Sequence, residues 1–315
     1  MAVLLAYFSV VLIWATTPLT IQWSSDSLSF IAAVVLRMSV ALGIGLAINL
    51  ALRRKLFGSE GAWKMYAAGA IGIFPNMPVV YWSAQFIPSG LVAVVFAMSP
   101  FVMGLMTLVL LKQNPFSFKR VFAFLLALIG LVVIFYHQFQ LNLRSVFGVA
   151  GILLSCFLFS FSSVLVKKLA VKTDAFNQAI GTMLFSLPAL LLMWWIFDGN
   201  VPKIISTKSL VSVSYLAVFG SLIGAGLFFY VLANMTPTSV SLITFMTPVL
   251  ALILGAWIGN ETLSVQLWIG AVLVIVALLL YLDLPSNNLF YKYLQRDSWT
   301  DDGLLDAKHD YHRYK

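Results

Sequence analysis

"YWSAQFIPSGLVAVVFAMSP", residues 81–100, recurs in altered form as "FYVLANMTPTSVSLITFMTP", residues 229–248. Each stretch begins with an aromatic pair and ends with Met, then Ser or Thr, then Pro. Pro100 and Pro248 are 148 positions apart, about half the length of the chain. The spacing between the apolar residues agrees as well, although identity is weak. This repetition predicts that the chain consists of two related halves.

Composition points to a membrane protein. Of the 315 residues, 61% are hydrophobic and 10% are charged, and the mean hydropathy is +0.98. A soluble domain carries about a quarter charged residues, so this chain lacks the polar surface needed in water. The net charge of +8 does not indicate a nucleic-acid partner, because no basic stripe with interleaved aromatic residues occurs. The expected surroundings are a lipid bilayer.

The apolar runs predict ten spanning helices. A bilayer core about 30 Å thick requires about 20 helical residues. The predicted spans are residues 2–21, 28–50, 63–83, 89–111, 119–137, 146–166, 175–197, 210–232, 237–259 and 264–282.

The basic residues orient these helices. If the amino terminus is cytoplasmic, fifteen of the nineteen Lys and Arg residues fall in inside loops or in the tail. Only Arg144, Lys203 and Lys208 fall outside, and Arg37 lies within a predicted helix. Basic residues concentrate on the cytoplasmic side of membrane proteins. We therefore expect a multi-pass protein of the cytoplasmic membrane with both termini cytoplasmic.

The duplication predicts an all-α fold of two inverted five-helix repeats, residues 1–138 and 145–283, followed by a polar cytoplasmic tail at 284–315. Because five is odd, the second repeat must cross the membrane upside down relative to the first. Secondary transporters commonly have this architecture, with a substrate site near the midplane between the repeats.

The sequence also resembles a known family. "FIPSGLVAVVFAMSPFVMGLM" and "MTPTSVSLITFMTPVLALILGAWIGNETLSVQLWIGAVLVIVAL", together with the Arg of "VVLRMSVAL", are similar to the EamA domains of the drug/metabolite transporter superfamily. The resemblance covers about residues 3 to 283. It implies ten helices, two inverted repeats, cytoplasmic termini and, for some members, export of small metabolites. The first repeat departs from the pattern, with Gln113 where the second has Glu261.

Pro100 and Pro248 predict helix kinks. Proline inside a helix removes a backbone hydrogen bond and clashes with the preceding turn. In hydrocarbon the freed carbonyl needs another partner, which the hydroxyl of Ser99 or Thr247 could supply. Each kink is either a hinge or cavity wall, or a static bend that shapes packing.

Arg37 and Glu261 are the two possible charge sites. Arg37 lies near mid-bilayer, where a charge costs at least about 2.5 kcal/mol, so it must face protein or water. It could bind a substrate carboxylate, but we favour a structural role, because the span 28–50 that contains it resembles a peripheral helix in the family. Glu261, near the end of a span, is either a proton-coupling carboxylate or a structural tie; we favour the tie, because a water-exposed turn desolvates it little.

The helices that line the centre in the family offer aromatic and uncharged hydrogen-bonding side chains, which suit a small amphipathic solute. The candidate cavity residues are Trp14, Thr17, Asn76, Tyr81, Trp82, Gln85, Ser99, Ser163, Tyr230, Asn234, Thr244 and Thr247. Taken singly, each could equally serve helix packing or the interfacial belt.

These features favour a secondary transporter, an exporter of amino acids or related amphipathic metabolites that works by alternating access, with a proton or counter-substrate as a candidate coupling partner. No Walker A loop, metal site or other cofactor motif is expected, and the His309–His312 pair reads as part of a solvated tail. The alternatives are a drug or nucleotide-sugar carrier of the same superfamily, or an integral membrane enzyme acting on lipids.

Overall fold

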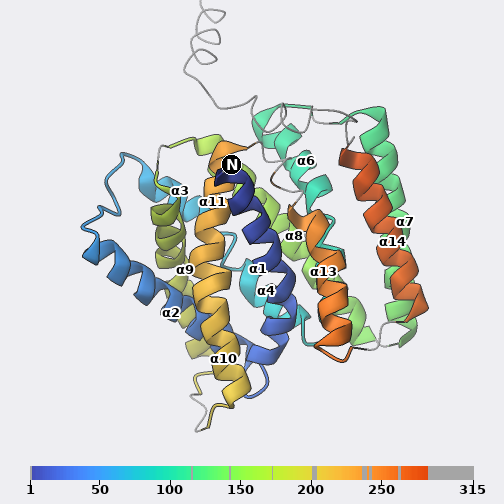
Figure 1. Ribbon diagram of the computed structural model, residues 1–315, viewed down its shortest axis with the longest axis horizontal. Helices are drawn as coiled ribbons and strands as arrows, with labels where there is room; N and C mark the ends of the chain where they lie inside the picture. Colours follow the sequence, from blue (N-terminus) through green and yellow to red (C-terminus); the bar gives the residue numbers. More distant parts are fainter. Residues whose placement is uncertain are drawn as a thin grey trace, which may run out of the picture.

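The computed structural model describes residues 2–114, 116–141, 143–171, 173–200, 204–235, 240, 243–261 and 264–282. Within these residues the chain is helical, without strands, and each predicted span contains helix (Figure 1). The predicted tail, 284–315, lies outside the described residues. The helices are α1 (Ala2–Ser24), α2 (Phe30–Ala51), α3 (Ala62–Ala70), α4 (Asn76–Ser83), α5 (Ser89–Phe96), α6 (Ser99–Leu111), α7 (Phe118–Leu141), α8 (Leu143–Leu169), α9 (Ala175–Phe197), α10 (Thr207–Tyr215), the π-helix η1 (Leu216–Ile223), α11 (Gly224–Asn234), α13 (Ile243–Trp257) and α14 (Val265–Leu282).

Six helical stretches of the described chain are long and apolar enough to cross a membrane. They are α1, α2, α5 with α6, α8, α9, and the continuous run from α10 to α11. The other four predicted spans are not among these six. The third is interrupted between α3 and α4, the fifth is α7, and the last two contain the shorter apolar helices of α13 and α14. The chain is an all-helical multi-pass membrane protein, and ten crossings stay a prediction.

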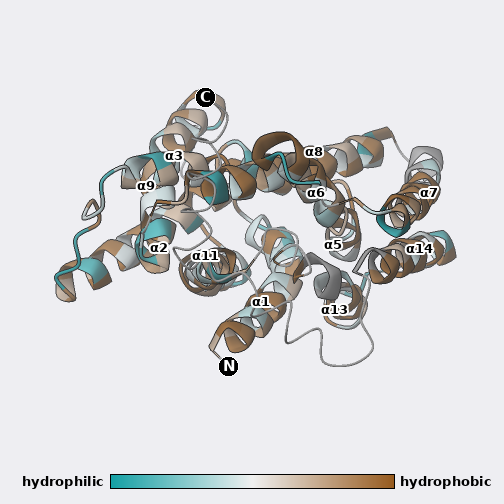
Figure 2. Cartoon of the chain, turned by 90° about the horizontal axis from the view of Figure 1, so that it is seen from above, coloured by the Kyte–Doolittle hydropathy of each residue, from teal (hydrophilic) through white to brown (hydrophobic). Residues whose placement is uncertain are grey.

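The molecule carries apolar side chains on its outside. Leu50, Trp195 and Trp257 are 81%, 72% and 84% exposed, whereas Arg37 and Asn76 are buried. Seen from above, the helices are mostly brown, the apolar end of the scale (Figure 2). So much exposed apolar surface would be unfavourable in water and suits lipid contact.

The packing of the helices repeats between the two halves. In the first half α1 packs against α11 and α13 of the second, and in the second half α8 packs against α4, α5 and α6 of the first. The duplication equates α1 with α8, α4 with α11, and α5–α6 with α13. Exchanging the halves therefore preserves these contacts. The largest buried apolar cluster joins both halves and includes Val34, Val95, Ile152 and Ile180.

Helices α7 and α14, which are also equivalent, pack together at one edge of the molecule (Figure 2). Gly130 and Gly270 lie at their contact. A Cβ atom on Gly130 would lie 2.9 Å from the carbonyl oxygen of Gly270, and one on Gly270 would lie 3.0 Å from that of Gly130. Glycine is required here because the two backbones touch, which is a common basis of helix association in membranes.

Candidate functional site

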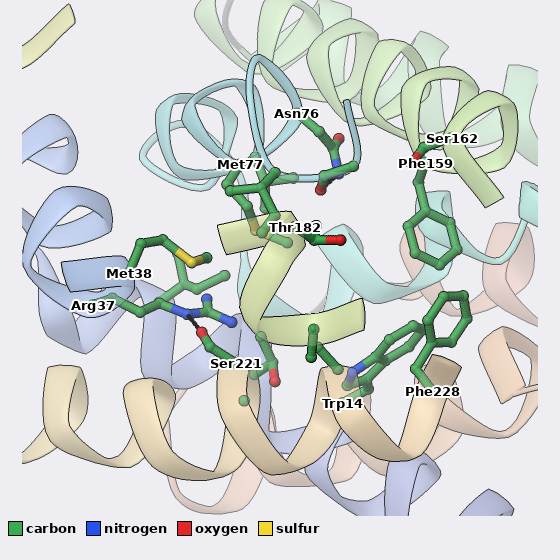
Figure 3. Close-up of a pocket in the computed structure, with 18 of the residues that line it drawn as sticks. Trp14, Arg37, Met38, Asn76, Met77, Phe159, Ser162, Thr182, Ser221 and Phe228 are labelled. Atoms are coloured by element: carbon green, nitrogen blue, oxygen red, sulfur yellow. Dashed lines mark hydrogen bonds between the residues drawn. The ribbon is translucent and has the colours of Figure 1, made fainter. Parts of the chain in front are cut away.

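A cavity of about 160 Å³ lies between the two halves, lined from α1, α2, α3, α4, α5, α8, α9, η1, α11 and α13 (Figure 3). Its volume is close to that of an apolar cavity known to accept benzene. The space therefore fits a small solute of about one ring in this conformation. It is smaller than the pockets of about 300–1,000 Å³ that hold drug-sized ligands.

Two interruptions of regular helix border the cavity. Residues 71–75 form turns between α3 and α4, and η1 is a π-helical segment between α10 and α11. With the 148-residue offset, η1 corresponds to residues 68–75, so the two interruptions are equivalent. Gly72 and Ile73 line the cavity from the first, and Gly220 and Ser221 from the second. Irregular backbone within a membrane is tolerated where it borders a cavity, and π-segments often occur at functional sites.

Equivalent positions of the two halves meet in the cavity lining. Gly72 with Gly220 and Ile73 with Ser221 are two such pairs. Three further pairs of lining residues are also 148 positions apart: Trp14 with Ser162, Met77 with Ala225, and Val80 with Phe228. The cavity is therefore shared by the two halves, where the inverted-repeat prediction expects the substrate.

One side of the cavity is aromatic. Phe159 is the centre of a cluster of rings, with its centroid 5.5 Å from those of Trp14 and Phe96 and 5.2 Å from that of Phe228. All four rings line the cavity. Rings at such separations attract one another and present a large apolar surface. This side suits the apolar body of a solute.

The guanidinium group of Arg37 lies in another wall of the cavity. Its side chain is 2% exposed. Nε donates to Oγ of Ser221 at 2.7 Å, and Nη1 donates to the hydroxyl of Tyr81 at 3.3 Å. Figure 3 shows the guanidinium reaching from α2 towards the middle of the cavity. The group is held by two neutral hydroxyls and faces a space that a solute could occupy.

The first predicted kink has the expected hydrogen bond. α5 ends at Phe96 and α6 begins at Ser99, with Pro100 in the first turn of α6. Pro100 cannot donate to the Phe96 carbonyl four residues back. That carbonyl instead accepts from Oγ of Ser99 at 2.5 Å. Pro248 lies inside α13, so this proline does not end a helix.

Two clasps with equivalent acceptors hold the end of α1 and the end of α8, each to a later helix of its own half. Near the end of α1, Nε2 of Gln22 donates to the carbonyls of Ala84 at 3.1 Å and Ile87 at 2.8 Å, at the end of α4. Near the end of α8, Nζ of Lys167 donates to the equivalent carbonyls. These are Leu232 at 2.9 Å and Met235 at 3.1 Å, together with Ala233 at 3.3 Å.

The two clasps lie at opposite ends of the molecule. Ser27, just after α1, bonds to Ser206 and Ser209 at the start of α10, whereas the Lys167 clasp holds the end of α11. The run from α10 to α11 is 28 residues long, or about 40 Å at 1.5 Å per residue.

Glu261 makes a third tie. Oε1 accepts from the backbone N–H of Ser89 at 2.8 Å, and Oε2 accepts from that of Gly90 at 3.2 Å. A carboxylate at the first free N–H groups of α5 satisfies donors that the helix itself cannot pair. Glu261 does not line the cavity, and it connects the chain after α13 to the start of α5.

The sequence-predicted residues divide into two groups. Those on the cavity lining are Trp14, Thr17, Arg37, Asn76, Ser163 and Thr247. Those elsewhere in the described chain are Tyr81, Trp82, Gln85, Ser99, Tyr230 and Asn234. The side chain of Thr244 lies outside the described residues.

The second group has other surroundings. Tyr81 is buried behind the cavity wall, where it accepts from Arg37. Trp82 is 37% exposed and packs edge-on against Phe86. Asn234 is exposed at the end of α11, where Nδ2 donates to the carbonyl of Tyr230 at 2.8 Å.

Several lining residues were not predicted, notably Phe96, Phe159, Thr182, Ser221 and Phe228. Ser221 lies in an apolar stretch, and Thr182 follows Asn177 and Gln178 in the apolar run 175–197. The duplication gave no polar signal for Ser221 either, because its equivalent in the first half is the apolar Ile73. The rest of the described chain offers no group of three or more His, Cys, Asp or Glu side chains that could hold a metal ion.

Comparison with known proteins identifies the family. The EamA-like transporter family matches residues 1–136 and again residues 146–282. Protein PecM of Dickeya dadantii is 26% identical over 275 residues, which cover 86% of this chain and 89% of PecM. The uncharacterized inner membrane transporter YedA of Escherichia coli K12 is 28% identical over 282 residues, 87% of this chain and 89% of YedA. A solved crystal structure superposes with a TM-score of 0.64 at 18% identity, covering 88% of this chain and 94% of that one, which shows a shared fold. The chain therefore belongs to the EamA-like transporter family and is a multi-pass membrane transporter rather than an enzyme.

Proposed function

We propose that this chain is a secondary transporter that exports small amphipathic metabolites, foremost amino acids, by alternating access. The observation that carries the proposal is the cavity between the halves, whose lining pairs equivalent residues such as Gly72 with Gly220 and Met77 with Ala225. A site shared by two inverted repeats can be opened to either side by rocking one repeat against the other. The export direction rests on the family resemblance.

In this proposal the two repeats, residues 1–138 and 145–283, cross the membrane ten times with opposite orientation. The repeated packing of α1 on α11 and of α8 on α4 supports this arrangement. The distribution of Lys and Arg supports cytoplasmic termini. The name of YedA, an inner membrane transporter, supports the cytoplasmic membrane as the location.

The clasps of Gln22 and Lys167 serve as end latches in this mechanism. Each ties the end of one helix to carbonyls of another helix in the same half, at opposite ends of the molecule. Because α1 and α8 also pack on helices of the opposite half, movement of one half against the other would strain these clasps. Alternating access requires that one end can open while the other stays closed. Releasing one clasp and keeping its equivalent would achieve this. The polar cavity residues Thr17, Asn76, Ser163 and Thr247 would contact the solute.

A nucleotide-sugar carrier is the less favoured alternative. Such a substrate carries several phosphate charges and would need clustered cations, but Arg37 is the sole cation among the described residues of the lining. A larger drug would exceed the cavity volume of about 160 Å³ in this conformation.

The proposal is tested by flux in proteoliposomes loaded with radiolabelled amino acids, with and without an imposed pH gradient. Accumulation that depends on the gradient supports a proton-coupled transporter. Equilibration that ignores the gradient supports an exchanger or facilitator with the same substrates. Absence of flux for every amino acid would refute the substrate assignment.

A further inference from the structure

Arg37 is a buried cation without a carboxylate partner in the described chain. Charged side chains are almost never fully buried unless they are paired, because the loss of hydration is costly. The recorded partners of Arg37 are the neutral hydroxyls of Ser221 and Tyr81. The charge is thus oriented by these hydroxyls and is not neutralised by a carboxylate of the described residues.

The acidic residues of the described chain are engaged elsewhere or lie on the surface. Asp174 pairs with Arg54, and Glu261 ties the start of α5. Asp26 pairs with Lys208, Asp198 accepts from Ser29, and Glu60 is exposed in a loop. None of these carboxylates contacts Arg37. The described residues leave Arg37 without a counter-charge, which the carboxylate of a solute would supply.

The cavity leaves room for that carboxylate. Nη2 of Arg37 lies 3.1 Å from the position that a Cβ atom on Gly220 would occupy. Any side chain at position 220 would crowd the guanidinium, so this glycine of η1 keeps the group uncovered. Because Nε and Nη1 are fixed by Ser221 and Tyr81, Nη2 is positioned to donate to an oxygen in the cavity. Arginine is well suited to bind carboxylates, since its planar donors match their geometry.

A second polar group on the lining also lacks a partner. Asn76 is 1% exposed, and Nδ2 donates to the carbonyl of Gly72 at 2.9 Å. Its Oδ1 atom is buried without a hydrogen-bond partner. A buried unpaired acceptor costs free energy, and a solute with an N–H donor, such as an ammonium group, would satisfy it.

We propose that Arg37, oriented by Ser221 and Tyr81, is the carboxylate subsite of the cavity, and that the transported solutes are small carboxylates with one apolar body. The aromatic side, formed by Trp14, Phe96, Phe159 and Phe228, holds that body. The Oδ1 atom of Asn76 accepts from an amino group where the solute has one. This inference rests on the proposed function, because it concerns the same cavity, and it reverses the structural role that the sequence favoured for Arg37.

The test uses three probes that share one ring: phenylalanine, 3-phenylpropionate, which lacks the amino group, and 2-phenylethylamine, which lacks the carboxylate. Binding of each to the purified full-length protein in lipid nanodiscs is measured by calorimetry. We expect the two carboxylates to bind at least about tenfold more tightly than phenylethylamine, as befits a charge-assisted hydrogen bond. Arg37→Gln should abolish that preference, whereas Arg54→Gln, which removes an exposed arginine, should preserve it.

Equal binding of all three probes to the wild-type protein would overturn the inference, as would an unchanged preference in Arg37→Gln. The wild-type comparison needs no variant, so it decides the question even if Arg37→Gln does not fold. Arg37→Lys keeps a cation and should retain a reduced preference. Amino-acid flux without a preference for carboxylates in binding would refute the Arg37 subsite and leave the proposed transport function standing. A preference for carboxylates in binding without amino-acid flux would support the subsite and refute the proposed transport of amino acids. Absence of both the preference and the flux would refute the subsite and the proposed function.

Discussion

Replacing Lys167 by Met should release one end of the transporter. The side chain keeps its length and apolar stem but loses the ammonium group that donates to the carbonyls of Leu232, Ala233 and Met235. Those carbonyls end α11, where a cation also stabilises the helix dipole. We therefore expect Lys167→Met to favour conformations in which the end of α8 separates from the end of α11.

The magnitude follows from the clasp geometry. A hydrogen bond to a charged group contributes about 1.5–3 kcal/mol. The three carbonyls share one ammonium, and Lys167 is only partly buried, so we discount the sum for solvent screening to about 2 kcal/mol in total. At 1.4 kcal/mol per factor of ten, the population open at this end should rise about 30-fold.

The assay is the modification rate of a cysteine on the cavity wall. Ser163 is buried on α8 and lines the cavity, and the native Cys156 is fully buried. In a Ser163→Cys background, Lys167→Met should raise the reaction rate with a charged, impermeant thiol reagent about 30-fold, if opening is fast relative to reaction. The reagent is applied from the Lys167 side. Lys168→Met, which removes the adjacent exposed lysine, is the control.

An unchanged rate in Lys167→Met, or an equal rise in Lys168→Met, would show that the clasp does not govern opening. A rise of the same size from both sides of the membrane would indicate general destabilisation. Gln22→Leu should increase the rate from the opposite side alone, because its clasp lies at the other end.

Three further predictions concern single positions. Glu261→Gln should lower the melting temperature in detergent, because the weaker tie to the start of α5 removes about 1–2 kcal/mol of folding free energy. Any response of flux to a pH gradient should stay unchanged, and loss of that response would assign Glu261 to proton coupling. Gly181→Ala should destabilise the protein by about 1–3 kcal/mol, because a Cβ atom there would overlap the ring of Tyr66; Gly43→Ala, with no atom within 4 Å of its new Cβ, should melt like the wild type. Phe159→Ala, which removes the central ring of the aromatic side, should raise KM for phenylalanine about tenfold or more, and an unchanged KM would place the apolar body elsewhere.

The helices were predictable from the sequence because hydrophobic run length alone identifies a span. The two breaks were not predicted, since residues 63–83 and 210–232 were each expected to form one continuous span. Pro75 and Pro78 accompany the interruption at 71–75, whereas "LAVFGSLI" of η1 contains no residue that requires π geometry. The duplication relates the two, because η1 occupies the positions equivalent to the first break.

The site was predicted in part, and helix rotation explains some of the remainder. Asn76, Met77 and Val80 face the cavity from α4, whereas Trp82 is exposed on the other side. Which face of α4 looks inward depends on the turns at 71–75 that precede it, and sequence spacing does not fix that rotation. Phe159 was missed for a different reason. The chain has 25 phenylalanines, so residue type alone could not separate this one from those that face lipid.

The two halves share a backbone plan but differ in chemistry at the cavity cation and at the clasps. The cation of the cavity, Arg37, has Phe185 as its equivalent, and the clasp at one end uses an amide, Gln22, where the other uses an ammonium, Lys167. Because a charge-assisted hydrogen bond is stronger than a neutral one, the Lys167 end should be the more firmly closed at rest. In the proposed mechanism, this asymmetry would set which side the empty cavity faces. It cannot by itself set the direction of net transport, since a conformational preference without an energy source does no work. That direction must come from the gradient of the solute or of a coupled ion, so the resting state and the driving force are separate properties, to be measured separately.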